Sequence, residues 1–213
     1  MQIKTIKTIW SKDDLKQNTH VLELEDGCLI VDAGCSLEEV KKVTNKPIIA
    51  VLITHGHFDH IDHVEEYDKL SVPICASKHI TKFLDNSTLN LSVWKTPKRY
   101  KINNIFPLED RDELDLGEVK IKCYNTPGHS SDSMCYLIDG RYLFSGDTVF
   151  SVAIGRLDLP TGDVEDMVKS LNLINKLEYQ EIYTGHGRQS TKEEQAENIS
   201  KWVETLKLNK VNY

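Results

Sequence analysis

The chain has 213 residues, of which 39% are hydrophobic and 28% are charged, and its formal net charge at pH 7 is −7. This length and composition predict one compact domain over residues 1–213, and no apolar run approaches the roughly 20 residues that a membrane helix needs. The acidic balance argues against nonspecific nucleic-acid binding, and the lack of a signal-peptide apolar core near Met1 predicts a cytoplasmic location.

Five cysteines, an odd number with no CxxC pair, predict reduced thiols. Most lie in apolar or strand-like runs, where cysteine is typical of a small buried hydrophobic side chain. A thiol that reacts with substrate is the alternative. The five positions are Cys28, Cys35, Cys75, Cys123 and Cys135.

The first half of the chain reads as strands and helices in alternation. Strands are expected at residues 19–25 and 28–32, and Asp26-Gly27 between them favours a type I′ hairpin turn. The other elements expected here are a helix capped by Ser36, a buried strand over 47–53, a helix over 64–70, a strand over 73–76 and a helix capped by Ser77.

The middle of the chain, residues 85–116, has the least regular pattern. Within it, residues 94–101 interleave four cations with Trp94 and Tyr100. Two interpretations stay open for this segment. It is either a solvated loop or a rim that attracts an anionic substrate.

The second half again contains strands before helices. Strands are expected at 119–124, 134–138 and 142–145, with Asp139-Gly140 as a hairpin turn. Further elements are an amphipathic helix capped by Asp163, a strand over 181–184 and a last helix that begins with the capping box 191–194. Strands and helices in both halves predict two sheets with outer helices, an α/β or α+β class.

A possible metal-binding loop follows the buried strand over 47–53. Three imidazoles and one carboxylate lie within six residues, at His55, His57, Asp59 and His60. Neutral imidazole and carboxylate are ligands that zinc and iron prefer. The loop therefore predicts a metal site rather than a polar surface turn.

Three further ligand candidates lie at strand ends or in glycine-containing loops, at His129, Asp147 and His186. The full set then has five imidazoles and two carboxylates. That is more than one ion takes up, but it suits two ions with one carboxylate bridging them. The expected cofactors are two divalent ions, with zinc as the first choice and iron or manganese as alternatives.

The motif His55-Gly56-His57-Phe58-Asp59-His60, with the three later ligands in order, resembles the metallo-β-lactamase superfamily. Four further segments resemble its glyoxalase II branch, the hydroxyacylglutathione hydrolases and their short relatives. These segments are residues 89–92, 126–130, 143–148 and 154–160.

This resemblance implies a four-layer αββα sandwich, the metallo-β-lactamase-like fold. It places His55, His57 and His129 on one metal and Asp59, His60 and His186 on the other, with Asp147 bridging. It also implies hydrolysis of a thioester by a hydroxide held between the two ions, with Asp59 and Asp147 as the catalytic carboxylates. The expected partner is a small-molecule thioester. Glutathione is less firmly implied, because glyoxalase II proper has a C-terminal helical region and only about 27 residues follow His186 here.

A persulfide dioxygenase on the same scaffold is the alternative from another reaction class, with one iron held by His55, His129 and Asp147. A β-lactamase is disfavoured by the missing signal peptide and by Asp147, where many of those enzymes have cysteine. A nuclease is disfavoured by the acidic single domain.

Several neighbouring residues keep two interpretations. Asp32 either supports the metal loop through hydrogen bonds or only ends its strand. Arg156 and Asp158 form a structural ion pair or contact substrate. His63 is expected to lie outside the ligand set.

Overall fold

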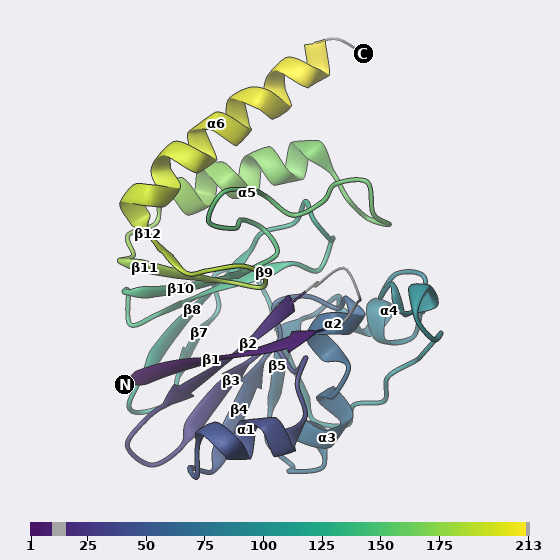
Figure 1. The fold of residues 1–213 in the computed structure, drawn as a ribbon, viewed down its shortest axis with the longest axis vertical. Coiled ribbons are helices and arrows are strands. Elements are labelled where there is room, and N and C mark those ends of the chain that lie inside the picture. The colour runs from purple at the N-terminus through teal and green to yellow at the C-terminus, as the bar shows by residue number, and fades with distance from the viewer. Residues whose placement is uncertain (10–15, 212–213) are drawn as a thin grey trace. The chain divides into compact units, whose positions relative to one another are not determined.

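The computed structural model describes residues 1–9 and 16–211 (Figure 1). Its contacts divide the chain into two compact units, Met1–Leu108 and Glu109–Tyr213. Each unit contains one six-stranded sheet and its own helices. The expectation that the two form one domain stays a prediction. Among the helices described, none is long and apolar enough to cross a membrane.

The sheet of the first unit has the strand order β1-β2-β3-β4-β5-β6. The first three strands pair antiparallel, and β3 to β6 pair parallel. Parallel strands need crossover connections, which the short helices between them supply. The strands are β1 (Gln2–Ile9), β2 (Lys16–Glu23), β3 (Cys28–Val31), β4 (Ile48–Leu52), β5 (Ile74–Ser77) and β6 (Ile105–Leu108).

The helices of the first unit bury their apolar side chains against this sheet. Ser36 caps the first of them, because its hydroxyl accepts from the Glu39 N–H at 3.3 Å, as predicted. Val40 and Tyr67 from two of the helices join Ile30 and Val51 of the strands in one buried cluster. The helices are α1 (Leu37–Val43), α2 (Phe58–Ile61), α3 (Val64–Asp68) and α4 (Ile80–Leu84), with a 3₁₀ turn η1 (Ser92–Trp94).

The sheet of the second unit has the order β12-β11-β10-β9-β8-β7 and is antiparallel except for the β10/β11 pair. Two helices, α5 (Val164–Lys176) and α6 (Lys192–Val211), lie side by side on one of its faces (Figure 1). The strands are β7 (Glu113–Asp115), β8 (Lys120–Asn125), β9 (Met134–Ile138), β10 (Tyr142–Gly146), β11 (Glu181–Thr184) and β12 (Ser190–Thr191).

Both helix starts of the second unit match the sequence. Asp163 accepts from the Asp166 N–H at 2.9 Å. Thr191 and Glu194 form the reciprocal capping box, each side chain accepting from the other's backbone N–H at 3.3 Å. These caps satisfy backbone donors that the first helical turn cannot satisfy itself.

Two local predictions in the first unit are wrong. Ser77 does not cap a helix; it is the last residue of β5, and His79 precedes α4 without a capping side chain. Asp26-Gly27 joins two antiparallel strands as expected, but not in a type I′ turn, because neither residue has a positive φ. The connection spans Leu24–Gly27 and is closed by a hydrogen bond from the Leu24 N–H to the Gly27 carbonyl.

Candidate metal centre

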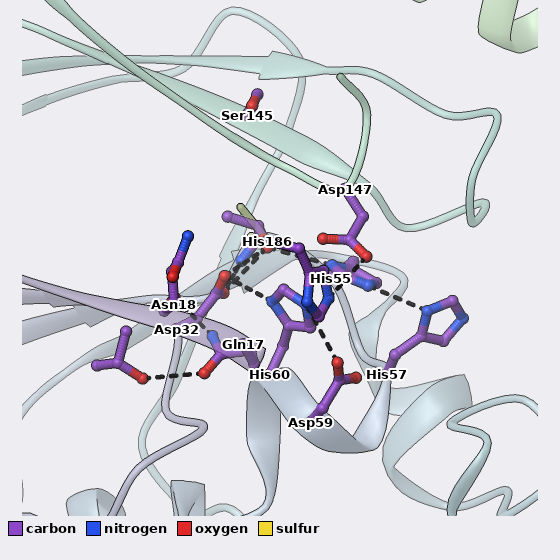
Figure 2. A network of polar contacts seen from close by, with 12 residues as sticks. Gln17, Asn18, Asp32, His55, His57, Asp59, His60, Ser145, Asp147 and His186 are labelled. Carbon is purple, nitrogen blue, oxygen red and sulfur yellow. Dashed lines mark hydrogen bonds and ion pairs between the residues drawn. The ribbon is translucent and has the colours of Figure 1, made fainter. Parts of the chain in front are cut away.

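The first unit brings four of the predicted ligands together at the end of β4. His55 Nε2 lies 3.0 Å from His57 Nδ1, and His60 Nε2 lies 3.7 Å from Asp59 Oδ2. The rings of His55 and His60 have centroids 4.1 Å apart. Figure 2 shows these side chains converging from the loop and from α2. All four are buried.

Asp32 supports this loop from the end of β3. Its buried carboxylate accepts from the Thr54 backbone N–H at 2.8 Å and from the Thr54 hydroxyl. It also accepts from His60 Nδ1 at 2.7 Å (Figure 2). Since a carboxylate only accepts, the His60 proton lies on Nδ1, and Nε2 is left with the lone pair that a metal needs. Of the two interpretations of Asp32, the structure therefore favours support of the loop.

The segment after α4 holds the other side of the loop. The Phe58 N–H donates to the Asn90 carbonyl at 2.7 Å, and the buried Asn90 amide donates to the Phe83 and Lys98 carbonyls.

His63 pairs with Glu66 at 2.8 Å, which agrees with its expected place outside the ligand set.

The cationic segment 94–101 is partly neutralised by acidic neighbours. Lys95 and Lys98 both pair with Asp62, and Lys98 also pairs with Glu65. The Lys98 ammonium lies 4.3 Å from the centroid of the Tyr100 ring. These pairings lower the positive charge that the segment presents to an anion, so they favour the solvated loop over the attracting rim.

The second unit brings its three predicted ligands together. Asp147 follows the last residue of β10, and its Oδ2 lies 3.3 Å from His186 Nε2 and 3.6 Å from His129 Nε2. His186 comes from the loop after β11 and His129 from the loop after β8. The Asp147 and His186 side chains are both labelled in Figure 2.

The backbone near Gly155 positions these ligands, which sequence patterns did not reveal. His129 Nδ1 donates to the Arg156 carbonyl at 2.9 Å, leaving Nε2 toward Asp147. A Cβ on Gly155 would lie 2.0 Å from the Asp147 carbonyl oxygen and 2.7 Å from His129 Nδ1. Only glycine allows this approach. The motif at residues 154–160 therefore needs glycine at position 155 because the backbone packs against two candidate ligands.

The donor spacing in each unit fits bound metal ions. Ligands of one four-coordinate zinc ion lie roughly 3.3 Å apart, since each is about 2.0–2.1 Å from the ion at a tetrahedral angle. The Nε2-to-carboxylate separations of 3.3, 3.6 and 3.7 Å match that value. Imidazoles held in one tautomer, beside carboxylates, are the donors that zinc and iron accept.

The cysteines take no comparable part. All five are buried thiols. Burial raises the pKa of Cys75 and of Cys135 to about 11, so neither carries much thiolate at neutral pH. The structure thus favours the packing role over a substrate-reactive thiol.

A scan against protein families matches residues 13–186 to the family described as "Metallo-beta-lactamase superfamily". The chain belongs to this superfamily. "Probable metallo-hydrolase YqgX" of Bacillus subtilis is 30% identical over 81% of this chain and 86% of that protein. A hydroxyacylglutathione hydrolase of Buchnera aphidicola is 32% identical over 70% of this chain, but only 53% of that longer protein is covered.

Solved structures agree with this membership. The BLEG-1 B3 metallo-beta-lactamase superposes with a TM-score of 0.82 at 29% identity, over 92% of this chain and 97% of that one. A di-iron-bound form of TTHA1623 gives a TM-score of 0.77 at 26% identity, over 91% and 98%. The predicted family and its metallo-β-lactamase fold are confirmed, and the chain is a metal-dependent hydrolase of this superfamily.

Proposed function

We propose that this superfamily member is a thioester hydrolase of the hydroxyacylglutathione hydrolase type, acting on a small-molecule thioester in the cytoplasm. Its seven ligand positions hold two divalent metal ions, with zinc as the first choice. The first ion takes His55, His57 and His129, the second takes Asp59, His60 and His186, and Asp147 bridges them.

The observation that carries the proposal is that, in each unit, a histidine ring is held in one tautomer with its Nε2 atom directed at a carboxylate. Asp32 fixes the tautomer of His60, and the Arg156 carbonyl fixes that of His129. Each of these two imidazoles then directs Nε2 toward a carboxylate, at a separation typical of two ligands of one ion. These separations are longer than an ordinary hydrogen bond, so two ligands around one ion explain them better than a direct hydrogen bond does.

Bound divalent ions supply a nucleophilic water at neutral pH and polarise a carbonyl oxygen. The chain's own residues prepare for this chemistry. Asp59, in the first turn of α2, orients the attacking water, and Asp147 lies beside the Nε2 atoms of both His129 and His186, where a bridging ligand would be. A thiolate leaving group needs no strong acid, because the pKa of a thiol is about 8.5.

The thioester class rests on the relatives. The Buchnera aphidicola relative is named a hydroxyacylglutathione hydrolase, and the similarity covers 70% of this chain. This chain spans about half of that relative's length, so the substrates tested include thioesters of other thiol carriers as well as of glutathione.

The decisive experiment combines elemental analysis with a substrate panel. Protein supplied with zinc, iron or manganese is tested for metal content and for hydrolysis of S-lactoylglutathione, acyl coenzyme A and simple acyl thioesters. We expect two ions per chain and turnover of at least one thioester. Metal-replete protein that hydrolyses no thioester contradicts the proposal.

The same experiment tests the two other superfamily chemistries. One iron per chain with sulfite formation from glutathione persulfide indicates a dioxygenase. Hydrolysis of a chromogenic β-lactam without any thioester turnover indicates the activity named for the BLEG-1 structure.

A further inference from the structure

The buried side chain of Gln195 on α6 joins the two backbone segments that follow Asp147 and His186. Its Nε2 donates to the Phe150 carbonyl at 3.0 Å and to the Ser190 hydroxyl at 2.7 Å. Phe150 lies three residues after Asp147, and Ser190 lies four residues after His186. The two hydrogen atoms of one amide therefore bind both ligand-bearing segments.

Asn198, one turn further along α6, reinforces the same contact. Its Nδ2 donates to the Phe150 carbonyl at 2.9 Å and to the Gln195 side-chain oxygen at 3.2 Å. The Phe150 carbonyl thus accepts from two side chains of one helix. Gln195 uses both of its amide hydrogens and its oxygen, so its orientation is defined by three partners.

Phe150 carries this connection to the ligand. Its ring meets the imidazole of His186 edge-on, with centroids 5.8 Å apart and an interplanar angle of 81°. The loop is closed behind it by the Phe150 N–H, which donates to the Ala153 carbonyl at 2.8 Å, and by the Val149/Ile154 bridge. A shift of the Phe150 backbone would therefore move the ring that packs on His186.

We propose that Gln195, assisted by Asn198, is a positioning residue for His186. It acts through Phe150 and keeps His186 Nε2 directed at the Asp147 carboxylate, 3.3 Å away. The inference rests on the proposed role of His186 as a metal ligand. This positioning role differs from a packing role. An apolar side chain of equal length would fill the same volume, but it would not hydrogen-bond to the segments that follow Asp147 and His186.

The test uses the full chain with Gln195→Met, which keeps the length of the side chain and removes its donors. Metal-free protein is titrated with zinc against a chromophoric chelator. We expect the second equivalent to bind about tenfold more weakly than in the wild type, the size typical of lost support behind a ligand, and the first equivalent to be unchanged. Asn198→Ala, at a half-buried position, should give a smaller loss of the same kind.

Leu206→Ala is the matched control, because it removes a buried apolar side chain from the same helix without touching these hydrogen bonds. Its thermal stability should fall while both equivalents bind as in the wild type. A second readout needs no metal: the ring-proton NMR signals of His186 should shift in Gln195→Met and stay in place in Leu206→Ala, because the Phe150 ring current changes only in the first.

The inference is overturned if Gln195→Met and Asn198→Ala both bind the second equivalent of zinc as tightly as the wild type and leave the His186 signals in place. If Gln195→Met does not fold, Asn198→Ala decides by the same two readouts. A wild-type chain that binds one equivalent contradicts the proposed ligand set instead, and the NMR comparison then decides the positioning role alone.

Discussion

The two units deliver their candidate ligands in different ways. In the first unit, four candidate ligands fall within six consecutive residues, and the buried Asp32 carboxylate orients one of them, His60, and holds the loop at Thr54. In the second unit, three ligands come from three loops, and neutral groups place them: the Arg156 carbonyl, the close approach of Gly155 and the Gln195 amide. The first arrangement depends on a charged group and the second on neutral groups and a close backbone approach.

This difference predicts which substitutions each unit tolerates. Replacing the Asp32 carboxylate with a neutral group of the same shape should weaken metal binding in the first unit. Adding a single carbon at Gly155, which changes no charge, should disturb the candidate ligands of the second unit.

The largest effect is expected for Gly155→Ala. The new Cβ would lie 2.0 Å from the Asp147 carbonyl oxygen, so the backbone or His129 must move. Misplacement of reacting groups by about 1 Å costs roughly a hundredfold in rate, so we expect at least that loss of hydrolysis together with a lower metal content. Steady-state kinetics and elemental analysis measure both.

Gly117→Ala is the control for Gly155→Ala. Its Cβ meets nothing within 4 Å, while its φ of +81° makes alanine strained. It should lose about 1 kcal/mol of unfolding free energy and keep its activity and its metal. Equal activity of the two alanine variants would show that the approach of Gly155 does not matter for the site.

Asp32→Asn should have the next largest effect. Asparagine tolerates the positive φ of 63° found here, so the backbone is preserved. The amide offers one acceptor oxygen where the carboxylate serves the Thr54 N–H, the Thr54 hydroxyl and His60 Nδ1. We expect metal affinity to fall about 10- to 100-fold, measured by chelator competition.

The exposed Asp85 gives the comparison for Asp32, because Asp85→Asn removes the same charge outside the loop. It should bind metal as the wild type does. Wild-type affinity in Asp32→Asn would mean that Asp32 only ends its strand.

All seven candidate ligand positions could be named from the sequence, because histidine and aspartate at strand ends and beside glycine are local patterns. Of the groups that orient them, Asp32 could be suggested from its place at a strand end, but those of the second unit could not. The Arg156 carbonyl reaches His129 across 27 residues, and Gln195 reaches Phe150 across 45. Such contacts depend on how distant segments pack, which no local pattern encodes.

The strands show a similar limit. Ile3, Ile6 and Ile9 recur every third residue in β1, so the alternation that predicts a strand is missing, although the pairing with β2 is regular. In β6, Pro107 argues against a strand, but β6 lies at the sheet edge, where proline is tolerated. Both segments are strands because they pair with a neighbouring strand, not because of their own sequence pattern.

The two Asp-Gly dipeptides form different turns although their local sequence is the same. Asp139 and Gly140 have φ of 51° and 63°, and the Arg141 N–H closes the turn onto the Ile138 carbonyl, as the dipeptide predicts. A Cβ on Gly27 would instead lie 2.5 Å from the Ile49 side chain. That glycine is needed for close packing against β4, and its turn takes another form.

Acid should weaken the first unit through Asp68. Burial raises the pKa of this carboxyl, but the N–H groups of Asn104 and Asn103 that donate to it outweigh burial and leave the pKa below its ordinary value. Its contribution to stability is therefore complete above the unfolded pKa of about 3.9 and is lost as pH falls through the lower folded value. Urea unfolding of wild type and Asp68→Asn should show a stability difference at pH 7 that narrows below pH ~4. A difference that is constant with pH would contradict the role of the charge.

The smallest effect is expected for Arg156→Gln. The guanidinium makes a two-pronged ion pair with Asp158, at 2.9 and 2.7 Å, but both side chains are exposed, and such pairs contribute little to stability. His129 is held by the Arg156 backbone carbonyl, which any residue provides. Metal content and thermal stability should therefore equal those of the wild type within error, in contrast to Gly155→Ala at the neighbouring position. If the Michaelis constant for the best thioester rises while metal content is unchanged, the side chain contacts substrate, and the structural interpretation of the Arg156/Asp158 pair is wrong.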